Sequence, residues 1–161
     1  MKAANIFDAI IESPRGSRNK YSFDTKSRQF YFNKTLPHGF TYPQNFGFIP
    51  DTKASDGDPI DILVMTDEPL VMNCIVKCRI LGALTVKQTK EGEKFRNDIL
   101  IGVPDASEFY KKFHTIEDLD KIMLDEFIFF FTAYHEQIGS KFKATKVLSV
   151  RAAVQLIKEA S

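Results

Sequence analysis

The chain has 161 residues, of which 43% are hydrophobic and 27% are charged, so its composition is that of a globular protein rather than a disordered one. With 22 basic and 21 acidic residues, the net charge is only +1, which excludes a strong overall field for attracting nucleic acid or an anionic membrane. No apolar run reaches the roughly 18 residues of a membrane-spanning helix. We therefore expect a single domain over residues 1–161 that contacts no membrane.

The first ten residues, MKAANIFDAI, contain too short an apolar stretch for a secretory signal peptide. Cys74 and Cys78 lie four positions apart in an apolar segment, a spacing that puts both side chains on one face of a strand. We interpret them as buried thiols rather than as a disulfide or a metal-binding pair. These features predict a cytoplasmic protein.

The first hundred residues have the patterns of strands, whereas the last sixty are predicted to be mostly helical. Residues 20–36 alternate in the manner of a hairpin with Lys26 and Ser27 near its turn. Further strands are expected at residues 60–65, 74–88 and 98–104. Residues 89–97 form a charged hairpin loop that carries Gly92. The pattern favours an α+β protein, mainly β, with a small sheet or barrel.

Two helices are predicted in the last third of the chain. Thr115 and Asp118 have the spacing of a capping box, and the apolar residues that follow have helical spacing until Gly139. Ser149 is positioned to open a final short helix. The first helix carries an aromatic stripe of Phe127, Phe130, Phe131 and Tyr134. Such a stripe is far more often part of a core than a cofactor site.

Three carboxylates, Asp56, Asp58 and Asp61, are crowded into six positions at the start of an apolar strand. A polar turn with a rigid corner at Pro59 is one interpretation. The other is a divalent metal site, because like charges this close repel one another unless a cation or a proton intervenes. The spacing differs from that of an EF-hand, since Gly57 stands second rather than sixth.

The stretch DGDPIDILV at residues 56–64 resembles the signature of the soluble Mg-dependent inorganic pyrophosphatase family. The upstream segments IIESP, NKYSFD and FTYPQNFGFIP resemble the same family in order and spacing, and residues 102–104 and 129–142 do so more loosely. The resemblance implies a small five-stranded, OB-like closed barrel with C-terminal helices packed on it. It also implies a homo-oligomer that uses Mg2+ to hydrolyse pyrophosphate to two phosphates.

Carried over residue by residue, the resemblance implies that Asp56, Asp58 and Asp61 hold the metal ions. Glu12 would support the metal or its water shell. Asp58 would also act as the general base that takes the proton from the metal-activated water.

The resemblance also implies a set of substrate-binding groups. Lys20 would pair with a phosphoryl oxygen, Tyr42 would donate its hydroxyl within the catalytic site, and Tyr134 would hydrogen-bond a product phosphate. Lys34 stands where the family has a phosphate-binding arginine, and it keeps the charge but loses the bidentate fork. His135 replaces a lysine.

Other positions depart from the family pattern. Ser22 stands for a glutamate, Phe46 for a tyrosine and Ile99 for a lysine. In the family, the hairpin at residues 88–97 brings two further metal-binding aspartates; here Gln88 or Thr89 replaces the first. Asn97 most nearly occupies the second, although a shift of one residue would turn Asp98 inward. The hairpin is instead basic, with Lys87, Lys90, Lys94 and Arg96, which either contact substrate phosphates or form a solvated loop.

Three hypotheses follow from these departures. The chain is a pyrophosphatase, a hydrolase that prefers another phosphoanhydride, or a non-catalytic phosphate- or metal-binding relative on the same scaffold. A nucleic-acid-binding barrel is a fourth possibility, suggested by the aromatic and basic residues 28–34. We reject it because 15 phenylalanines without tryptophan in a near-neutral chain fit a core better than a stacking surface.

Overall fold

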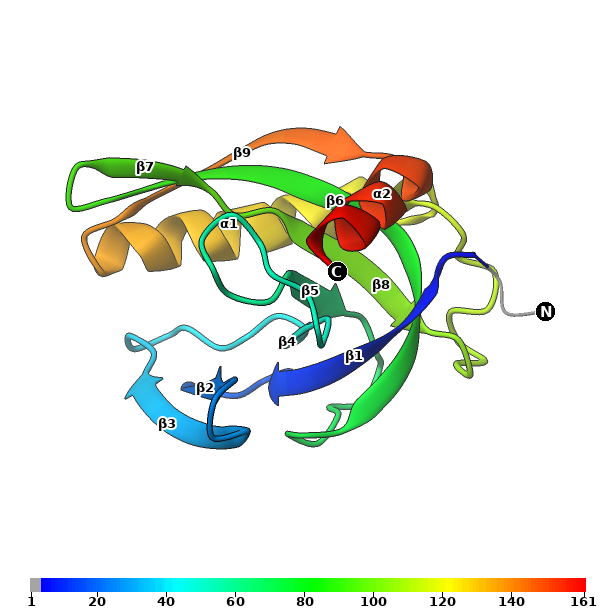
Figure 1. Cartoon of the computed structure of the whole chain (residues 1–161), viewed down its shortest axis with the longest axis horizontal. Helices are drawn as coiled ribbons and strands as arrows, with labels where there is room; N and C mark the ends of the chain where they lie inside the picture. The colour runs from blue at the N-terminus through cyan, green and yellow to red at the C-terminus, as the bar shows by residue number, and fades with distance from the viewer. Residues whose placement is uncertain (1–3) are drawn as a thin grey trace.

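The computed structural model describes residues 4–161 and is mainly β, with two α-helices near the C-terminus (Figure 1). The strands are β1 (Ile6–Ser13), β2 (Asn19–Asp24), β3 (Gln29–Thr35), β4 (Asn45–Phe48), β5 (Asp61–Val64), β6 (Ile75–Lys90), β7 (Glu93–Arg96), β8 (Ile99–Pro104) and β9 (Lys141–Leu148). The helices are a 3-10 turn, η1 (Ile116–Asp118), and the α-helices α1 (Lys121–Gln137) and α2 (Val150–Ala160).

Five strands pair in a closed ring. Strand β1 pairs with β4, β4 with β5, β5 with β8, β8 with β6, and β6 again with β1. Only the β5–β8 pair is parallel. Strands β7 and β9 pair with the C-terminal half of the long strand β6, outside the ring. Strands β2 and β3 form a separate hairpin (Figure 1). The ring confirms the predicted small, OB-like architecture of five strands.

Alternate side chains of the ring strands enter two different cores. In β5, Ile62 and Val64 belong to one buried cluster, together with Ala153 and Ile157 of α2. Leu63, between them, belongs to the other cluster, which contains the aromatic side chains of α1. This period of two follows from the pleat of a strand. We call the cluster that contains Ile62 and Val64 the α2 core and the cluster that contains Leu63 the α1 core. The two cores therefore lie on opposite faces of the same strands.

The 16-residue strand β6 takes part in several pairings because it bends at Gly82. The register slips between Ile80 and Gly82, and Gly82 has a φ of 154°. A Cβ at this position would lie 2.5 Å from the carbonyl oxygen of Leu148, so only glycine fits. The bend lets one half of β6 close the ring while the other half pairs with β9 and β7.

The two predicted helices exist, but the first begins later than the capping box indicates. The carboxylate of Asp118 accepts from the backbone N of Thr115 at 3.0 Å, yet this box opens only the turn η1. Asp120 caps α1, accepting from the backbone N of Ile122. The helix ends near Gly139 as predicted, and Ser149 caps α2 by accepting from the backbone N of Ala152.

The aromatic stripe of α1 is buried, as predicted, and the side chains of Phe127, Phe130, Phe131 and Tyr134 belong to the α1 core. The prediction that the last sixty residues are mostly helical is wrong for residues 141–148. They form β9, in which Phe142 and Ala144 face the α1 core while Lys141 and Lys143 are exposed. That alternation is a strand signal in the sequence itself.

The two cysteines are not joined in a disulfide within residues 4–161. Cys78 is fully buried in the α2 core, and burial raises the pKa of its thiol to about 12, while Cys74 is partly buried. The predicted free thiols are confirmed, but only Cys78 is buried; Cys74 lies just before β6 begins. Of the helices in the described chain, none is both long and apolar enough to cross a membrane. The cytoplasmic location stays a prediction.

Candidate functional site

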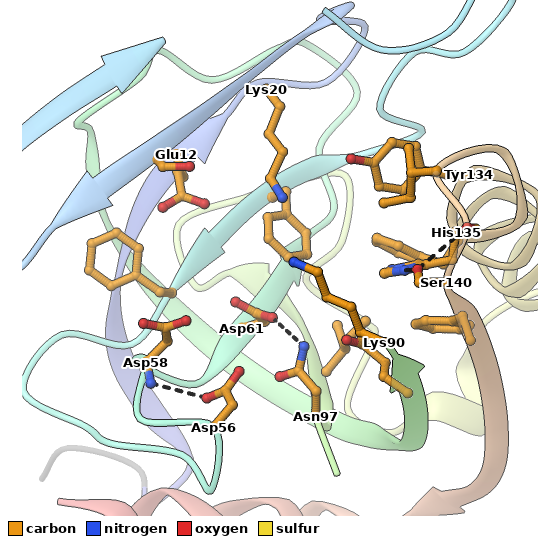
Figure 2. Close-up of a pocket in the computed structure, with 18 of the residues that line it drawn as sticks. Glu12, Lys20, Asp56, Asp58, Asp61, Lys90, Asn97, Tyr134, His135 and Ser140 are labelled. Carbon is orange, nitrogen blue, oxygen red and sulfur yellow. Dashed lines mark hydrogen bonds between the residues drawn. The ribbon is translucent and has the colours of Figure 1, made fainter. Parts of the chain in front are cut away.

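A cavity of about 490 Å³ lies on the α1 face of the ring, between the β2–β3 hairpin, the β6–β7 hairpin and the C-terminal part of α1. All nine of the predicted site residues line it: Glu12, Lys20, Lys34, Tyr42, Asp56, Asp58, Asp61, Tyr134 and His135. Figure 2 shows the carboxylates on one side of this cavity and Tyr134 and His135 across from them. Residues far apart in the sequence thus meet in one place.

The pleat of the ring strands decides which side chains reach the cavity. Asp61 begins β5 two positions before Leu63, so it points to the same face as this residue of the α1 core. Gln88 has the same relation to Val86 in β6, and both lie on the α1 face. A shift of one residue in any of these strands would direct the polar groups into the α2 core.

A tight loop presents Asp56 and Asp58. The backbone N of Ala54 donates to the carbonyl oxygen of Asp58 at 2.7 Å, and that of Gly57 donates to the carbonyl oxygen of Ala54 at 2.9 Å. Gly57 has a φ of 90°, which glycine adopts without strain. The Asp56 carboxylate accepts from the backbone N of Asp58 at 3.0 Å. The turn interpretation of this stretch is correct, and it holds two carboxylates at the edge of the cavity.

The four carboxylates of the cavity influence one another. Burial and the nearby charge of Glu12 raise the pKa of Asp61 to about 8, although Asn97 donates to Asp61 Oδ2 at 3.3 Å. Burial also raises the pKa of Glu12, whose Oε2 accepts from the backbone N of Phe23 at 2.9 Å. Burial likewise raises the pKa of Asp56. In each of these groups the cost of burying the charged form outweighs the hydrogen bonds and nearby charges that lower the pKa.

The donor set fits a hard divalent cation. It consists of carboxylate oxygens, the ligands that Mg2+ and Ca2+ prefer, while the imidazole of His135 lies across the cavity from them (Figure 2). In the part of the chain that the structure describes, no three His, Cys, Asp or Glu side chains stand close enough together to enclose a metal ion. The carboxylates are therefore gathered around the cavity without forming a closed cage.

Lysines of the β2–β3 hairpin form the opposite wall. Lys20 and Lys34 are paired across the two strands, and the register slips directly after Lys20. The Lys34 ammonium lies 5.5 Å from the ring centroid of Tyr134, in a cation–π arrangement. Figure 2 shows the Lys20 side chain pointing into the cavity. The two ammonium groups supply positive charge to the cavity, and that of Lys20 acts to lower the pKa values of Glu12 and Asp61.

Two phenols belong to this wall. The hydroxyl of Tyr134 is buried, and among residues 4–161 it has no hydrogen-bond partner. An unsatisfied buried hydroxyl is uncommon in folded proteins and calls for a ligand or a water. Tyr42 is also buried, and burial raises the pKa of its phenol, so the group is a neutral donor at ordinary pH.

His135 is held in a neutral form. Its Nδ1 lies 2.7 Å from Ser140 Oγ, and its ring stacks on Phe142 with centroids 5.2 Å apart. Burial, together with the charges of Lys20 and Lys34, lowers the pKa of the imidazole to about 4. His135 therefore adds hydrogen-bonding capacity to the cavity near pH 7 but no charge.

The β6–β7 hairpin brings amides to the cavity rather than carboxylates. Gln88 and Asn97 both line it. Asp98 points the other way, because its Oδ1 accepts from the backbone N of Val86 at 3.1 Å and its Oδ2 pairs with Arg96 at 2.7 Å. The unshifted register, with Asn97 inward, is the one in the structure. The alternative with Asp98 in the site is wrong.

One further lysine reaches the cavity. Lys90 lines it, whereas Lys87, Lys94 and Arg96 of the same hairpin do not. The sequence contains the signal that singles it out, since Lys90 has the parity of Val86 and Gln88 along β6. The four basic residues of this hairpin therefore differ in position, and a solvated loop describes only those outside the cavity.

Carboxylates, lysines and phenol hydroxyls around one cavity are the chemical groups suited to a divalent cation and a phosphorylated anion. A family model described as inorganic pyrophosphatase matches residues 9–161. The inorganic pyrophosphatase of Methanosarcina acetivorans is 32% identical over 99% of this chain and 93% of its own length. That of Geobacillus stearothermophilus is 35% identical over 96% and 91%.

Solved structures agree with these relatives. The inorganic pyrophosphatase of Helicobacter pylori superposes with a TM-score of 0.90 at 28% identity, covering 99% of this chain and 94% of that one. The enzyme from Thermus thermophilus gives a TM-score of 0.89 at 31% identity, covering 99% and 91%. The chain belongs to the inorganic pyrophosphatase family, which confirms the predicted family.

Proposed function

We propose that the protein hydrolyses inorganic pyrophosphate to two phosphates in this cavity, with Mg2+ as its cofactor. One observation carries the proposal: the four carboxylates and the lysine and phenol groups expected to bind phosphate line the same cavity. The relatives bear the name of this activity and match the chain over nearly its whole length. A structural role for the carboxylates alone would not require lysines opposite them.

The carboxylate wall supplies the cation site and the base. Asp56, Asp58 and Asp61 are the groups that would hold Mg2+, and Glu12 would support its water shell. When bound, the cation would neutralise the substrate and acidify a water molecule. Asp58 would accept the proton of the attacking water, because its side chain is exposed at the rim of the cavity and its loop is fixed by backbone hydrogen bonds.

The opposite wall binds and orients the anion. The ammonium groups of Lys20 and Lys34 pair with phosphoryl oxygens, in charge-assisted hydrogen bonds. The unpartnered hydroxyl of Tyr134 donates to a phosphate, and the neutral phenol of Tyr42 donates within the site. His135 offers a neutral imidazole, which hydrogen-bonds the anion without adding charge.

A second candidate function is the binding of a phosphorylated ligand without turnover, or the hydrolysis of a different phosphoanhydride. It rests on the β6–β7 hairpin, where Gln88 and Asn97 face the cavity as amides. A site with fewer carboxylates binds divalent cations more weakly, so fewer of them are present to activate a water molecule. This candidate predicts binding of pyrophosphate with little release of phosphate, and release from tripolyphosphate or a nucleotide would identify the altered substrate.

The test is the release of phosphate from pyrophosphate as Mg2+ is increased. We expect metal-dependent release that Asp58→Asn loses, because the amide keeps the shape of the side chain but removes the base and an anionic ligand. Asp51→Asn is the matched control, since Asp51 is exposed outside the cavity. No release from the folded wild type above that of Asp58→Asn would overturn the proposal in favour of the second candidate.

We also propose that residues 1–161 act as one domain and that the protein forms a homo-oligomer in the cytoplasm. The family model spans most of the chain, from residue 9 to residue 161. Exposed apolar side chains, among them Phe129 at 73% and Ile122 at 65% exposure, lie on α1. Ile122 and Phe129 are seven positions apart and so lie on one side of this helix, where together they would suit contact with a second copy of the chain.

A further inference from the structure

Lys90 is the one lysine of the β6–β7 hairpin that lines the cavity. It ends β6, directly before a two-residue turn at Glu91 and Gly92, whose φ values are 52° and 78°. Positive φ at both residues is the mark of a tight hairpin turn that matches the twist of its strands. The backbone of Lys90 is therefore fixed by the ladder to β7, where it is paired with Glu93.

The side chain of Lys90 points into the cavity, from a wall different from that of Lys20 (Figure 2). Among the described residues, Lys90 forms no ion pair, not even with its cross-strand neighbour Glu93. Its charge is also felt by Tyr134, on which Lys20 and Lys90 both act to lower the pKa, against the larger effect of burial. An ammonium group aimed at a cavity without a carboxylate partner is suited to an external anion.

The charges that face the cavity show what this ammonium group can do. Four carboxylates, Glu12, Asp56, Asp58 and Asp61, face three lysines, Lys20, Lys34 and Lys90. The β6–β7 hairpin brings no carboxylate to the site, only the amides of Gln88 and Asn97 and this ammonium group. A phosphoanhydride bound here would face the fixed charges of these lysines in addition to any cation that the carboxylates would hold.

We infer that Lys90 is a substrate-binding residue that contacts a phosphoryl oxygen of pyrophosphate and supplies positive charge that a divalent cation would otherwise provide. The inference rests on the proposed function for the identity of the anion. It goes beyond that function because it makes pyrophosphate binding depend less on Mg2+. Without Lys90, the lysines of the site would lie on the β2–β3 hairpin alone, and binding would depend more on Mg2+. Lys87 and Lys94 have no such role, because both are exposed outside the cavity.

Calorimetric binding of imidodiphosphate, a pyrophosphate analogue whose bridging nitrogen resists hydrolysis, tests the inference at constant ionic strength. The titration is run with a chelator and then at increasing Mg2+. Lys90→Met keeps an unbranched apolar stem and removes the charge, and Lys94→Met makes the same change on the outer side of the same hairpin. Thermal unfolding of each variant verifies that it is folded.

We expect Lys90→Met to weaken binding about tenfold or more without Mg2+, since a charge-assisted hydrogen bond is lost. The deficit should shrink as Mg2+ rises, and Lys94→Met should stay within about twofold of the wild type, as expected for a screened surface charge. Equal affinity of wild type and Lys90→Met at every Mg2+ concentration would overturn the inference. So would an equal loss in Lys94→Met, which would show a general field rather than a contact.

The outcome for Lys90 is separable from that of the proposed function. If imidodiphosphate binding depends on Lys90 but pyrophosphate is not hydrolysed, the inference stands and the hydrolase proposal fails. If pyrophosphate is hydrolysed but the affinity for imidodiphosphate does not change in Lys90→Met, the hydrolase proposal stands and the inference about Lys90 fails.

Discussion

The unpartnered hydroxyl of Tyr134 allows stability and function to be separated by the removal of one oxygen atom. Tyr134 is 5% exposed, and its ring stacks on Phe130 with centroids 6.2 Å apart, so the ring belongs to the α1 core. Its hydroxyl, in contrast, makes no hydrogen bond within residues 4–161. Tyr134→Phe keeps the ring packing and deletes only the polar atom.

In the ligand-free protein, this deletion should be stabilising. Leaving a buried hydroxyl unsatisfied costs about 1–3 kcal/mol, and even partial relief of about 1 kcal/mol raises the melting temperature by roughly 2–4 °C in a chain of this size. For ligand binding, the same deletion should be unfavourable. Loss of a hydrogen bond to a charged group, about 1.5–3 kcal/mol, weakens phosphate binding roughly ten- to 150-fold.

The assay combines thermal unfolding in chelator with calorimetric binding of imidodiphosphate. Tyr21→Phe is the control, because the Tyr21 hydroxyl accepts from Asn19 and Tyr21 does not line the cavity. We expect that control to leave binding unchanged. A Tyr134→Phe protein that melts at a lower temperature and binds the analogue as well as the wild type would refute the reasoning, since the hydroxyl would then be satisfied without ligand.

Three further predictions follow. The pKa of His135 is lowered to about 4 from 6.5, so between these values the unfolded chain binds a proton that the folded chain does not. The protein should therefore lose stability as the pH falls from 6.5 towards 4. His135→Gln should reduce that loss, measured in denaturant titrations at each pH. Asn97→Asp places a carboxylate beside Asp61 and should tighten Mg2+ binding several-fold by calorimetry while lowering the melting temperature in chelator; unchanged affinity would contradict the site geometry. Phe129→Glu should reduce the oligomer measured by light scattering, whereas an unchanged mass would place the interface elsewhere.

The sequence predicts those parts of the site that depend on local pattern. The acidic stretch contains its own turn, with Gly57 and Pro59, and leads into a strand whose pleat directs Asp61 to one face. Resemblance to a family then supplies partners that lie far away in the chain, such as Lys20 and Tyr134. They meet because the β2–β3 hairpin, which carries Lys20, and the C-terminal part of α1, which carries Tyr134, border the same cavity.

What the sequence leaves open is decided by tertiary pairing. The register of the β6–β7 hairpin has two readings in the sequence; the hydrogen bond from Val86 to the Asp98 carboxylate is the contact that fixes Asn97 inward. Asp120 caps α1 in place of the box at Thr115, because the chain leaves η1 in an extended conformation at Leu119. The pairing of β9 with β6 joins segments roughly sixty residues apart, a distance over which local periodicity carries no information.

A crystal structure with Mg2+ and imidodiphosphate tests the central claim most directly, because it shows where cation and anion lie. We predict cation density at Asp56, Asp58 and Asp61, and the two phosphoryl groups in contact with Lys20, Lys34 and Lys90, with the Tyr134 hydroxyl donating to one of them. An analogue bound outside the cavity, or bound in it without a cation on the carboxylates, would contradict the account.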